Sequence, residues 1–443
     1  MKEPEYYEIR HIKGETTQIE VDNGRLESGG TSFFDVAVIR VLGDSGWGVV
    51  SVDTFDPDNK KKLNEYLAQG MALASITGEK VKIEPTEAFL LPVPSLKENP
   101  TGISLEEKAD LLMGIERSAK IDSIVSTRAN YIEKHEEVLF FDSSGKEFTY
   151  NTTRCGFNVL AVAGKNGLIQ MASEREHTIE GFNLRHKAET GLLSAELAVS
   201  LLDAKPAKAL TVNAVLDPEL AGVFAHEAVG HAGEGDLVLE GSSVLKGRIG
   251  EDIGPDFLTI SDDPTLPMFG FEPVDAEGST VVKTDIVRTG KINAFLHNRE
   301  TLCRIGDGQL GHARAMAGSV PIVRMSNTFI ENGDAKREEL FSECREGVYL
   351  KGSRGGQVDP GRGVFQFNAE YGYLIENGEC TRMIRDVSLS GEILSTLHSI
   401  LLCANDRQMN EGYCGKGGQS VPVSDGAPHI LLSNAVVGGS VVD

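Results

Sequence analysis

A helix signal that carries two histidines at an unusual spacing limits the local structures open to this chain. Asp217 can cap the free amides at the start of the helix, and Pro218 suits its first position. The helix then runs through the pattern H-E-x-x-x-H at 226–231. At about 100° per residue, five steps place the two histidines roughly 140° apart, so a regular helix cannot direct both side chains to one point. We therefore expect a local bulge of the π type, for which Gly230 supplies backbone freedom.

The residue types in this pattern are those of a zinc site. Neutral imidazoles bind Zn²⁺ strongly, and a carboxylate beside the first ligand can take a proton from a water that the ion activates. We predict that His226 and His231 are zinc ligands and that Glu227 is the general base. Two alternatives stay open, which are a structural or inhibitory metal and a pair of histidines that only cap the helix end.

A catalytic zinc ion needs a third protein ligand. The candidates are Glu234, Asp236, the other histidines and the six cysteines, and spacing alone does not choose among them. Cys414 stands out because the glycines around it would let a loop reach into the site, and Lys416 would favour the thiolate. The alternative is that Cys414 is an inert buried residue, as most intracellular cysteines are.

Several motifs together resemble one known family. They lie at 226–236, 355–359, 373–378, 414–420 and 436–439, and they span nearly the whole second half of the chain. In these segments the sequence is similar to the TldD/PmbA family of metallopeptidases, and specifically to its catalytic TldD-like branch.

The resemblance implies a function, a ligand set and an assembly. In that family the two motif histidines and the cysteine of the C-G-K-x-G-Q element hold zinc, which implies His226, His231 and Cys414 here, with Glu227 as the catalytic glutamate. Members have an N-terminal α/β domain and a β-rich C-terminal domain, and they form dimers around an internal cavity. We therefore expect extended peptides as substrates, and a homodimer or a heterodimer with a homologue that lacks the zinc motif.

Other polar residues are weaker candidates, because each residue type is more often a surface or satisfied buried group. Peptide hydrolysis needs a group that stabilises the oxyanion, and ligands need groups that orient them. The candidates are His297, His312 and Arg354 for the oxyanion, Gln357 and Asp359 for substrate contact or ligand support, and Glu234 and Asp236 for orienting a ligand histidine.

The fold class follows from periodicity and length. A chain of 443 residues exceeds what one hydrophobic core usually organises. Alternating segments interrupted by amphipathic helices predict an α+β protein whose N-terminal α/β domain, 1–205, has an antiparallel sheet flanked by helices. Ser104 with Glu107 forms a capping box for one of these helices, and Asn377-Gly378 suits the type I′ turn of a hairpin at 373–380. The predicted linker is 203–208, and a mainly-β domain at 206–443 carries the histidine helix.

Net charge and cysteine usage indicate which partners and which cellular compartment to expect. Acidic residues outnumber basic ones by 66 to 43, which gives a net charge of −23 and makes nucleic acid an unsuitable partner. The sequence has no long apolar run, and its cysteines form no C-x-x-C pair, so we expect a cytoplasmic protein without a membrane span.

The sequence therefore predicts zinc-dependent hydrolysis of peptide bonds in short or unfolded polypeptides. The rival enzyme hypothesis is an amidohydrolase that acts on a small non-peptide substrate through the same site. The rival without catalysis is a binding or regulatory subunit with a structural metal.

Overall fold

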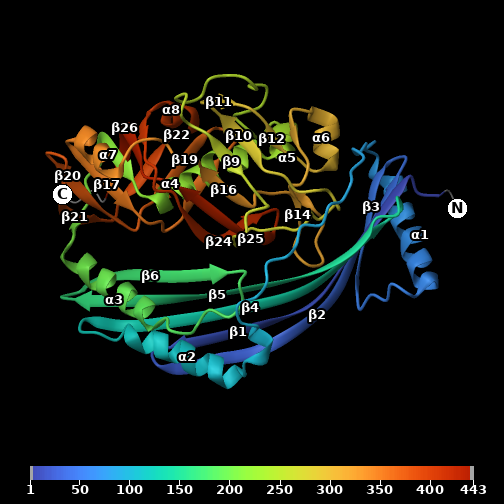
Figure 1. The fold of residues 1–443 in the computed structure, drawn as a ribbon, viewed down its shortest axis with the longest axis horizontal. Coiled ribbons are helices and arrows are strands. Elements are labelled where there is room, and N and C mark those ends of the chain that lie inside the picture. Colours follow the sequence, from blue (N-terminus) through green and yellow to red (C-terminus); the bar gives the residue numbers. More distant parts are fainter. Residues whose placement is uncertain (1–2, 440–443) are drawn as a thin grey trace.

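The first half of the chain forms one long antiparallel sheet. The structure is a computed structural model that describes residues 3–439, and Figure 1 shows the curved sheet of the first half below the more compact second half. The strand order is β3-β2-β1-β4-β5-β6, and every neighbouring pair is antiparallel. The strands are β1 (Tyr6–Asp22), β2 (Arg25–Gly43), β3 (Gly46–Asp53), β4 (Ile124–Asp142), β5 (Glu147–Lys165) and β6 (Leu168–Thr178).

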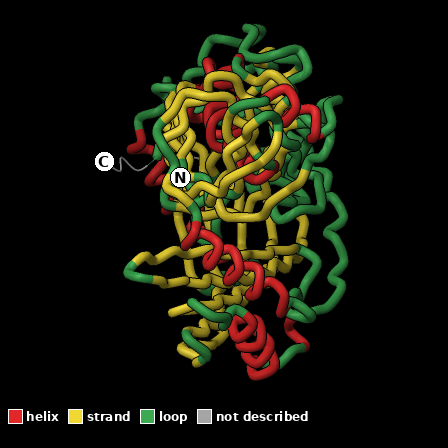
Figure 2. Tube along the Cα trace, turned by 90° about the vertical axis from the view of Figure 1, so that its left-hand side faces the viewer, coloured by secondary structure: helices red, strands yellow, loops and turns green. Residues whose placement is uncertain are grey.

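Three helices flank this sheet, as the apolar periodicity predicts. They are α1 (Lys60–Thr77), α2 (Leu105–Ser118) and α3 (Ala188–Asp203). Helices α2 and α3 lie on the face of the sheet that points away from the second half, and Figure 2 shows them from the end of the molecule. The predicted cap of α2 is confirmed, because the Ser104 side chain accepts a hydrogen bond from the amide of Glu107. The apolar face of α2 is buried against the sheet through Leu112 and Ile115.

The second half contains two larger sheets. One has the order β11-β10-β9-β16-β25-β24, and the other has the order β18-β19-β22-β26-β8-β17-β20-β21-β7 with β23 paired to β26. The strands of the first are β9 (Ile260–Asp262), β10 (Thr284–Arg288), β11 (Lys291–Ile292), β16 (Asn327–Ile330), β24 (Gln408–Lys416) and β25 (Gln419–Ala427). Those of the second are β7 (Lys205–Pro206), β8 (Leu210–Leu216), β17 (Gly347–Lys351), β18 (Gly356–Asp359), β19 (Val364–Asn368), β20 (Tyr371–Glu376), β21 (Glu379–Arg385), β22 (Ser388–Glu392), β23 (Ile400–Cys403) and β26 (Ile430–Gly438).

Short elements complete this half. Four strands form two small pairs, β12 (Phe295–Leu296) with β13 (Gly308–Gln309) and β14 (Ala313–Arg314) with β15 (Ile322–Val323). The helices are α4 (Pro218–Phe224), α5 (Gly235–Glu240), α6 (Arg299–Ile305), α7 (Arg337–Cys344) and α8 (Ile393–His398). Helix α4 contacts strands of both large sheets, so the helix that leads into the histidine pattern is held between them.

The α+β fold class is confirmed, with an antiparallel sheet and helices in the first half and mostly strands in the second. The predicted hairpin at 373–380 is present as β20 and β21, and its turn residues Asn377 and Gly378 have φ of 55° and 81°. The predicted linker, 203–208, contains β7, which pairs with β21. The domain boundary at 205/206 stays a proposal. Across residues 3–439, none of the helices is both long enough and apolar enough to traverse a bilayer.

Candidate metal centre

The predicted π bulge is present at the histidine pattern. Helix α4 ends at Phe224, and Ala225–Gly230 forms a π turn in which the amide of His231 donates to the carbonyl of His226. This wider turn brings the two imidazole rings to a centroid distance of 5.3 Å with an angle of 85° between their planes. The five-residue spacing is therefore compatible with one shared site because the backbone is locally unwound.

The reason for glycine at position 230 differs from the one predicted. Gly230 has φ of −58° and ψ of −57°, which any residue adopts in a helix, so backbone freedom is not what this position requires. A Cβ atom there would lie 1.9 Å from the sulfur of Met325. Glycine is needed because the π turn packs directly against that side chain.

Cys414 completes the cluster from the other end of the chain. Its sulfur lies 3.3 Å from Nε2 of His231, and one donor atom from each of His226, His231 and Cys414 lies within 4.8 Å of the others. All three side chains are buried. Cys414 belongs to strand β24 rather than to the loop that the flanking glycines suggested, and the turn at Gly417 and Gly418 follows it.

A buried arginine holds the Cys414 strand in place. Arg324 is fully buried, and its guanidinium donates to the carbonyls of Cys414 and Gln419. These two residues are on the two strands of the β24–β25 hairpin. Sequence reasoning missed Arg324, because no local pattern marks an arginine that bonds to carbonyls about ninety residues away.

The cluster favours a thiolate. Burial alone would raise the pKa of the Cys414 thiol, but the charge of His226 and hydrogen bonds from both histidines lower that pKa to about 4. The pKa of each histidine moves the other way. Burial lowers it, whereas Cys414 raises that of His226, and Glu234 and Cys414 raise that of His231 well above its ordinary value. Sulfur is therefore in the state that binds metals.

Glu234 orients one of the two rings. This carboxylate is fully buried and lies 2.8 Å from Nδ1 of His231, so Nδ1 carries the proton and Nε2 is directed towards Cys414. The sequence predicts that Lys416 favours the Cys414 thiolate, but the Lys416 ammonium group lies 3.0 Å from Glu234 and 2.7 Å from Asp236 and therefore pairs with these carboxylates. Burial raises the pKa of Glu234, but His231 and Lys416 lower it below its usual value.

Glu227 lies beside the cluster with access to solvent. Its carboxylate is 3.8 Å from Nε2 of His231, and 31% of its side chain is exposed. The same π turn that aligns the histidines thus leaves a carboxylate at the open side of the site. That position suits a group that exchanges protons with a water molecule.

The donor set fits a zinc ion. A tetrahedral ion with one sulfur and two imidazole ligands separates sulfur from nitrogen by about 3.6 Å, close to the 3.3 Å between Cys414 and His231. The thiolate and the hydrogen bond between Nδ1 of His231 and a buried carboxylate are both features of metal ligands. Within residues 3–439, these three side chains form a group that can hold an ion.

Three other predicted residues are not part of the metal cluster. His297 and His312 are fully buried; His297 is 3.0 Å from the Thr301 hydroxyl, and His312 is 3.0 Å from that of Thr284. Burial lowers the pKa of His297 to about 4, so it is neutral. A substrate oxygen cannot reach either ring in this structure. Arg354 is exposed, and its guanidinium donates to the carbonyl of Met171 on β6.

Gln357 and Asp359 are on strand β18, which contacts the π turn. Both side chains are exposed, and β18 lies at the edge of its sheet. They are therefore near the metal centre without being part of it. Their role in substrate contact stays a prediction.

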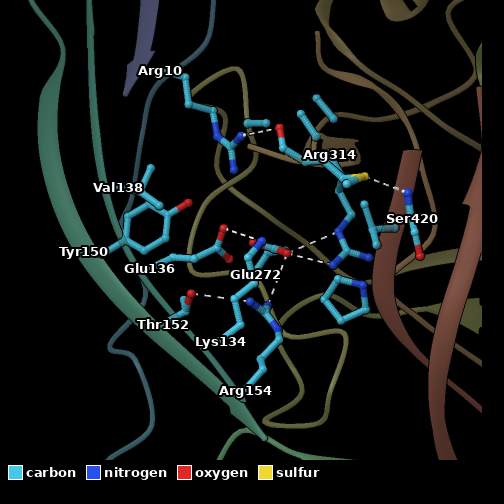
Figure 3. A pocket seen from close by; sticks show the side chains of 16 residues that line it. Arg10, Lys134, Glu136, Val138, Tyr150, Thr152, Arg154, Glu272, Arg314 and Ser420 are labelled. Atoms are coloured by element: carbon cyan, nitrogen blue, oxygen red, sulfur yellow. Dashed lines mark hydrogen bonds and ion pairs between the residues drawn. The ribbon is translucent and has the colours of Figure 1, made fainter. Parts of the chain in front are cut away.

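A charged cavity lies between the first sheet and the metal-site hairpin. Figure 3 shows Arg154 from β5 and Arg314 from the second half, both pointing to Glu272, which lies 3.4 Å and 2.7 Å from them. Arg10 and Lys134 line the same cavity, as does Ser420, which pairs across the hairpin with the residue after Cys414. These ion pairs join the two halves next to the strand that carries the cysteine.

Comparisons with known proteins show the family to which this chain is similar. Three family descriptions match the chain, which are "PmbA/TldA metallopeptidase domain 1" at residues 7–74, the central domain at 98–202 and the C-terminal domain at 210–439. A metalloprotease of Archaeoglobus fulgidus is 39% identical over 98% of this chain and 100% of its own. A protein called "Zinc metalloprotease TldD homolog" from Saccharolobus solfataricus is 33% identical over 72% of each chain. The crystal structure of TldE from Thermococcus kodakarensis shares the fold, with a TM-score of 0.77 at 18% identity over 98% of this chain and 97% of that one.

Proposed function

This chain belongs to the PmbA/TldA metallopeptidase family, and from that membership we propose that it hydrolyses peptide bonds in short or unfolded polypeptides with the help of zinc. The ligands would be His226, His231 and Cys414. The single observation that carries the proposal is the convergence of these three buried side chains, whose donor atoms lie within 4.8 Å of one another although Cys414 is 183 residues from His231.

Each residue around the site has its own role in the proposed reaction. When bound, zinc would lower the pKa of a water molecule and polarise the peptide carbonyl. Glu227 is the base in this proposal, because its partly exposed carboxylate can accept the proton of the attacking water and later pass it to the leaving amine. Glu234 accepts a hydrogen bond from Nδ1 of His231 and so directs Nε2 towards the metal position. The Cys414 thiolate donates negative charge to the ion, which weakens its acidity and increases the demand on Glu227.

An extended polypeptide suits the surroundings of the site. Strand β18 ends its sheet, contacts the π turn and exposes Gln357 and Asp359. A peptide that adds to such an edge is held by main-chain hydrogen bonds, which tolerate many sequences. The proposed assembly is a homodimer or a heterodimer with a homologue that lacks the zinc motif.

The test compares wild-type protein with Glu227→Gln. Zinc-loaded protein is incubated with an unfolded peptide mixture, and products are read by mass spectrometry. We expect Glu227→Gln to keep its zinc and to cleave about 10²–10⁴-fold more slowly, because the amide cannot accept a proton. Glu240→Gln is the matched control, since it neutralises an exposed carboxylate at the end of α5, outside the metal centre and outside β18, and should keep most activity.

Two outcomes would overturn the proposal. Cleavage by Glu227→Gln at most of the wild-type rate would remove Glu227 as the base. Zinc-loaded wild-type protein that leaves every peptide intact but hydrolyses small blocked amides would favour the amidohydrolase, and inactivity on both would favour a structural metal.

A further inference from the structure

In the part of the chain that the structure describes, three buried polar atoms on the histidine helix and the Cys414 hairpin have no hydrogen-bond partner. They are Nδ1 of His226, Oδ1 of Asp425 and Nδ2 of Asn410. Asp425 and Asn410 face each other across the β24–β25 hairpin, so their side chains are neighbours. Leaving a buried polar group without a partner costs free energy, so each such group in a folded protein calls for an explanation, such as a bound ion or a catalytic role.

Helix and hairpin geometry place Asp425 against the His226 ring. Gly222 is one turn before His226, and a Cβ atom at Gly222 would lie 2.8 Å from Oδ1 of Asp425. Side chains on a helix lean towards its N-terminus, so the His226 ring covers the turn that contains Gly222. Only glycine at 222 leaves room for the Asp425 carboxylate to approach that turn.

The carboxylate also lies on the metal-facing side of the hairpin. Cys414 pairs with Val421, and side chains alternate along a strand, so residues 421, 423 and 425 share the face that carries the Cys414 sulfur. Burial raises the pKa of the Asp425 carboxyl to about 7, and the charge of His226 opposes that rise. Asp425 and His226 are therefore close enough to interact electrostatically.

The contact between His231 and Glu234 suggests by analogy what the Asp425 carboxylate does for His226. Nδ1 of His231 is bonded to Glu234 while its Nε2 faces Cys414. We propose that Asp425 is the positioning residue for His226, whose Nδ1–H donates to the Asp425 carboxylate while Nε2 binds the metal, and that Asn410 holds that carboxylate. This inference rests on the proposed function, because it requires that His226 is a metal ligand.

The test measures zinc affinity of metal-stripped protein by competition with a coloured chelator. Residues that orient a ligand histidine typically contribute 10–100-fold to metal affinity. We expect Asp425→Ala to bind zinc 10–100-fold more weakly and Asp425→Asn to recover most of that loss, because the amide oxygen still accepts the Nδ1–H. The charge-transfer band of the cobalt-substituted protein should change in Asp425→Ala and return in Asp425→Asn.

Asp406→Ala is the control for loss of an Asp–His contact, which is partly buried here. Asp406 lies 2.7 Å from Nδ1 of His429, outside the metal centre. This variant should lose stability but keep wild-type zinc affinity. Asp425→Ala with wild-type affinity and cobalt spectrum would overturn the inference, and so would a loss of affinity in Asp406→Ala as large as in Asp425→Ala.

A measurement on wild-type protein decides the case even where Asp425→Ala does not fold. In zinc-loaded protein labelled with ¹⁵N-histidine, the inference predicts that His226 carries its proton on Nδ1 and its metal on Nε2, and the reverse assignment would overturn it. Failure of the proposed function is distinct, because zinc-loaded wild-type protein would then leave peptides intact, whereas zinc affinity and the assignment of the His226 nitrogens are measured without any substrate.

Discussion

Removing the Glu234 carboxylate should weaken zinc binding without unfolding the protein. Glu234 is fully buried and lies 2.8 Å from Nδ1 of His231. In Glu234→Ala the ring loses the group that fixes its tautomer and orientation. We expect a loss of 10–100-fold in zinc affinity, which corresponds to about 1.4–2.7 kcal/mol.

The structure also limits the cost to folding. Lys416 lies 3.0 Å from Glu234, but it is 2.7 Å and 2.8 Å from the two oxygens of Asp236 as well, so its charge stays paired in the variant. The lost contact is then one charge-assisted hydrogen bond to His231, and we expect the free energy of unfolding of the metal-free protein to fall by about 1–3 kcal/mol. Glu234→Gln keeps an oxygen that accepts the Nδ1–H, so it should recover most of the zinc affinity.

The assay is chelator competition on metal-stripped protein, with urea unfolding in the presence of a chelator to separate binding from folding. Asp236→Asn is the control, since Asp236 contacts Lys416 but no ligand histidine among the hydrogen bonds of the described chain. If Glu234→Ala bound zinc within about twofold of wild type, the reasoning on His231 would be wrong.

Two further predictions concern the backbone and the thiolate. Gly230→Ala should destabilise the protein by about 1–3 kcal/mol in urea unfolding, because the new methyl group meets the Met325 sulfur. The control is Gly114→Ala in α2, which should be neutral or stabilising because a Cβ there meets no atom within 4 Å. Equal effects of the two substitutions would contradict the packing argument. For metal-free protein, the difference in absorbance at about 240 nm between wild type and Cys414→Ser should show a thiolate at neutral pH. Because the pKa of Cys414 is lowered to about 4, this signal should disappear only as the pH falls through that value, and a midpoint near the ordinary thiol pKa would contradict the account.

Local signals in the sequence predicted local structure well. The Ser104 cap and the Asn377–Gly378 turn depend on residues a few positions apart, and both are present. The π turn between His226 and His231 was also predictable, because two ligands five residues apart cannot share one site on a regular helix. Such features need no knowledge of the rest of the chain.

Long-range contacts were not predictable in the same way. Gly230 is required by its contact with Met325, and Arg324 supports a strand far along the chain. Neither contact leaves a pattern in the surrounding residues. Asp425 lies in no recognisable motif either. Only the folded structure shows that the β24–β25 hairpin brings its carboxylate against the helical turn that contains Gly222. Cys414 was singled out from its glycine-rich surroundings, although the expected loop is a strand.

The central claim is that one zinc ion is bound by two imidazoles and the Cys414 sulfur. X-ray absorption at the zinc edge tests it directly on zinc-loaded wild-type protein and on Cys414→Ser. The account predicts one sulfur neighbour at about 2.3 Å together with nitrogen or oxygen neighbours at about 2.0–2.1 Å in the wild type, and loss of the sulfur signal in the variant. A wild-type spectrum without sulfur, or a sulfur signal that survives in Cys414→Ser, would contradict it.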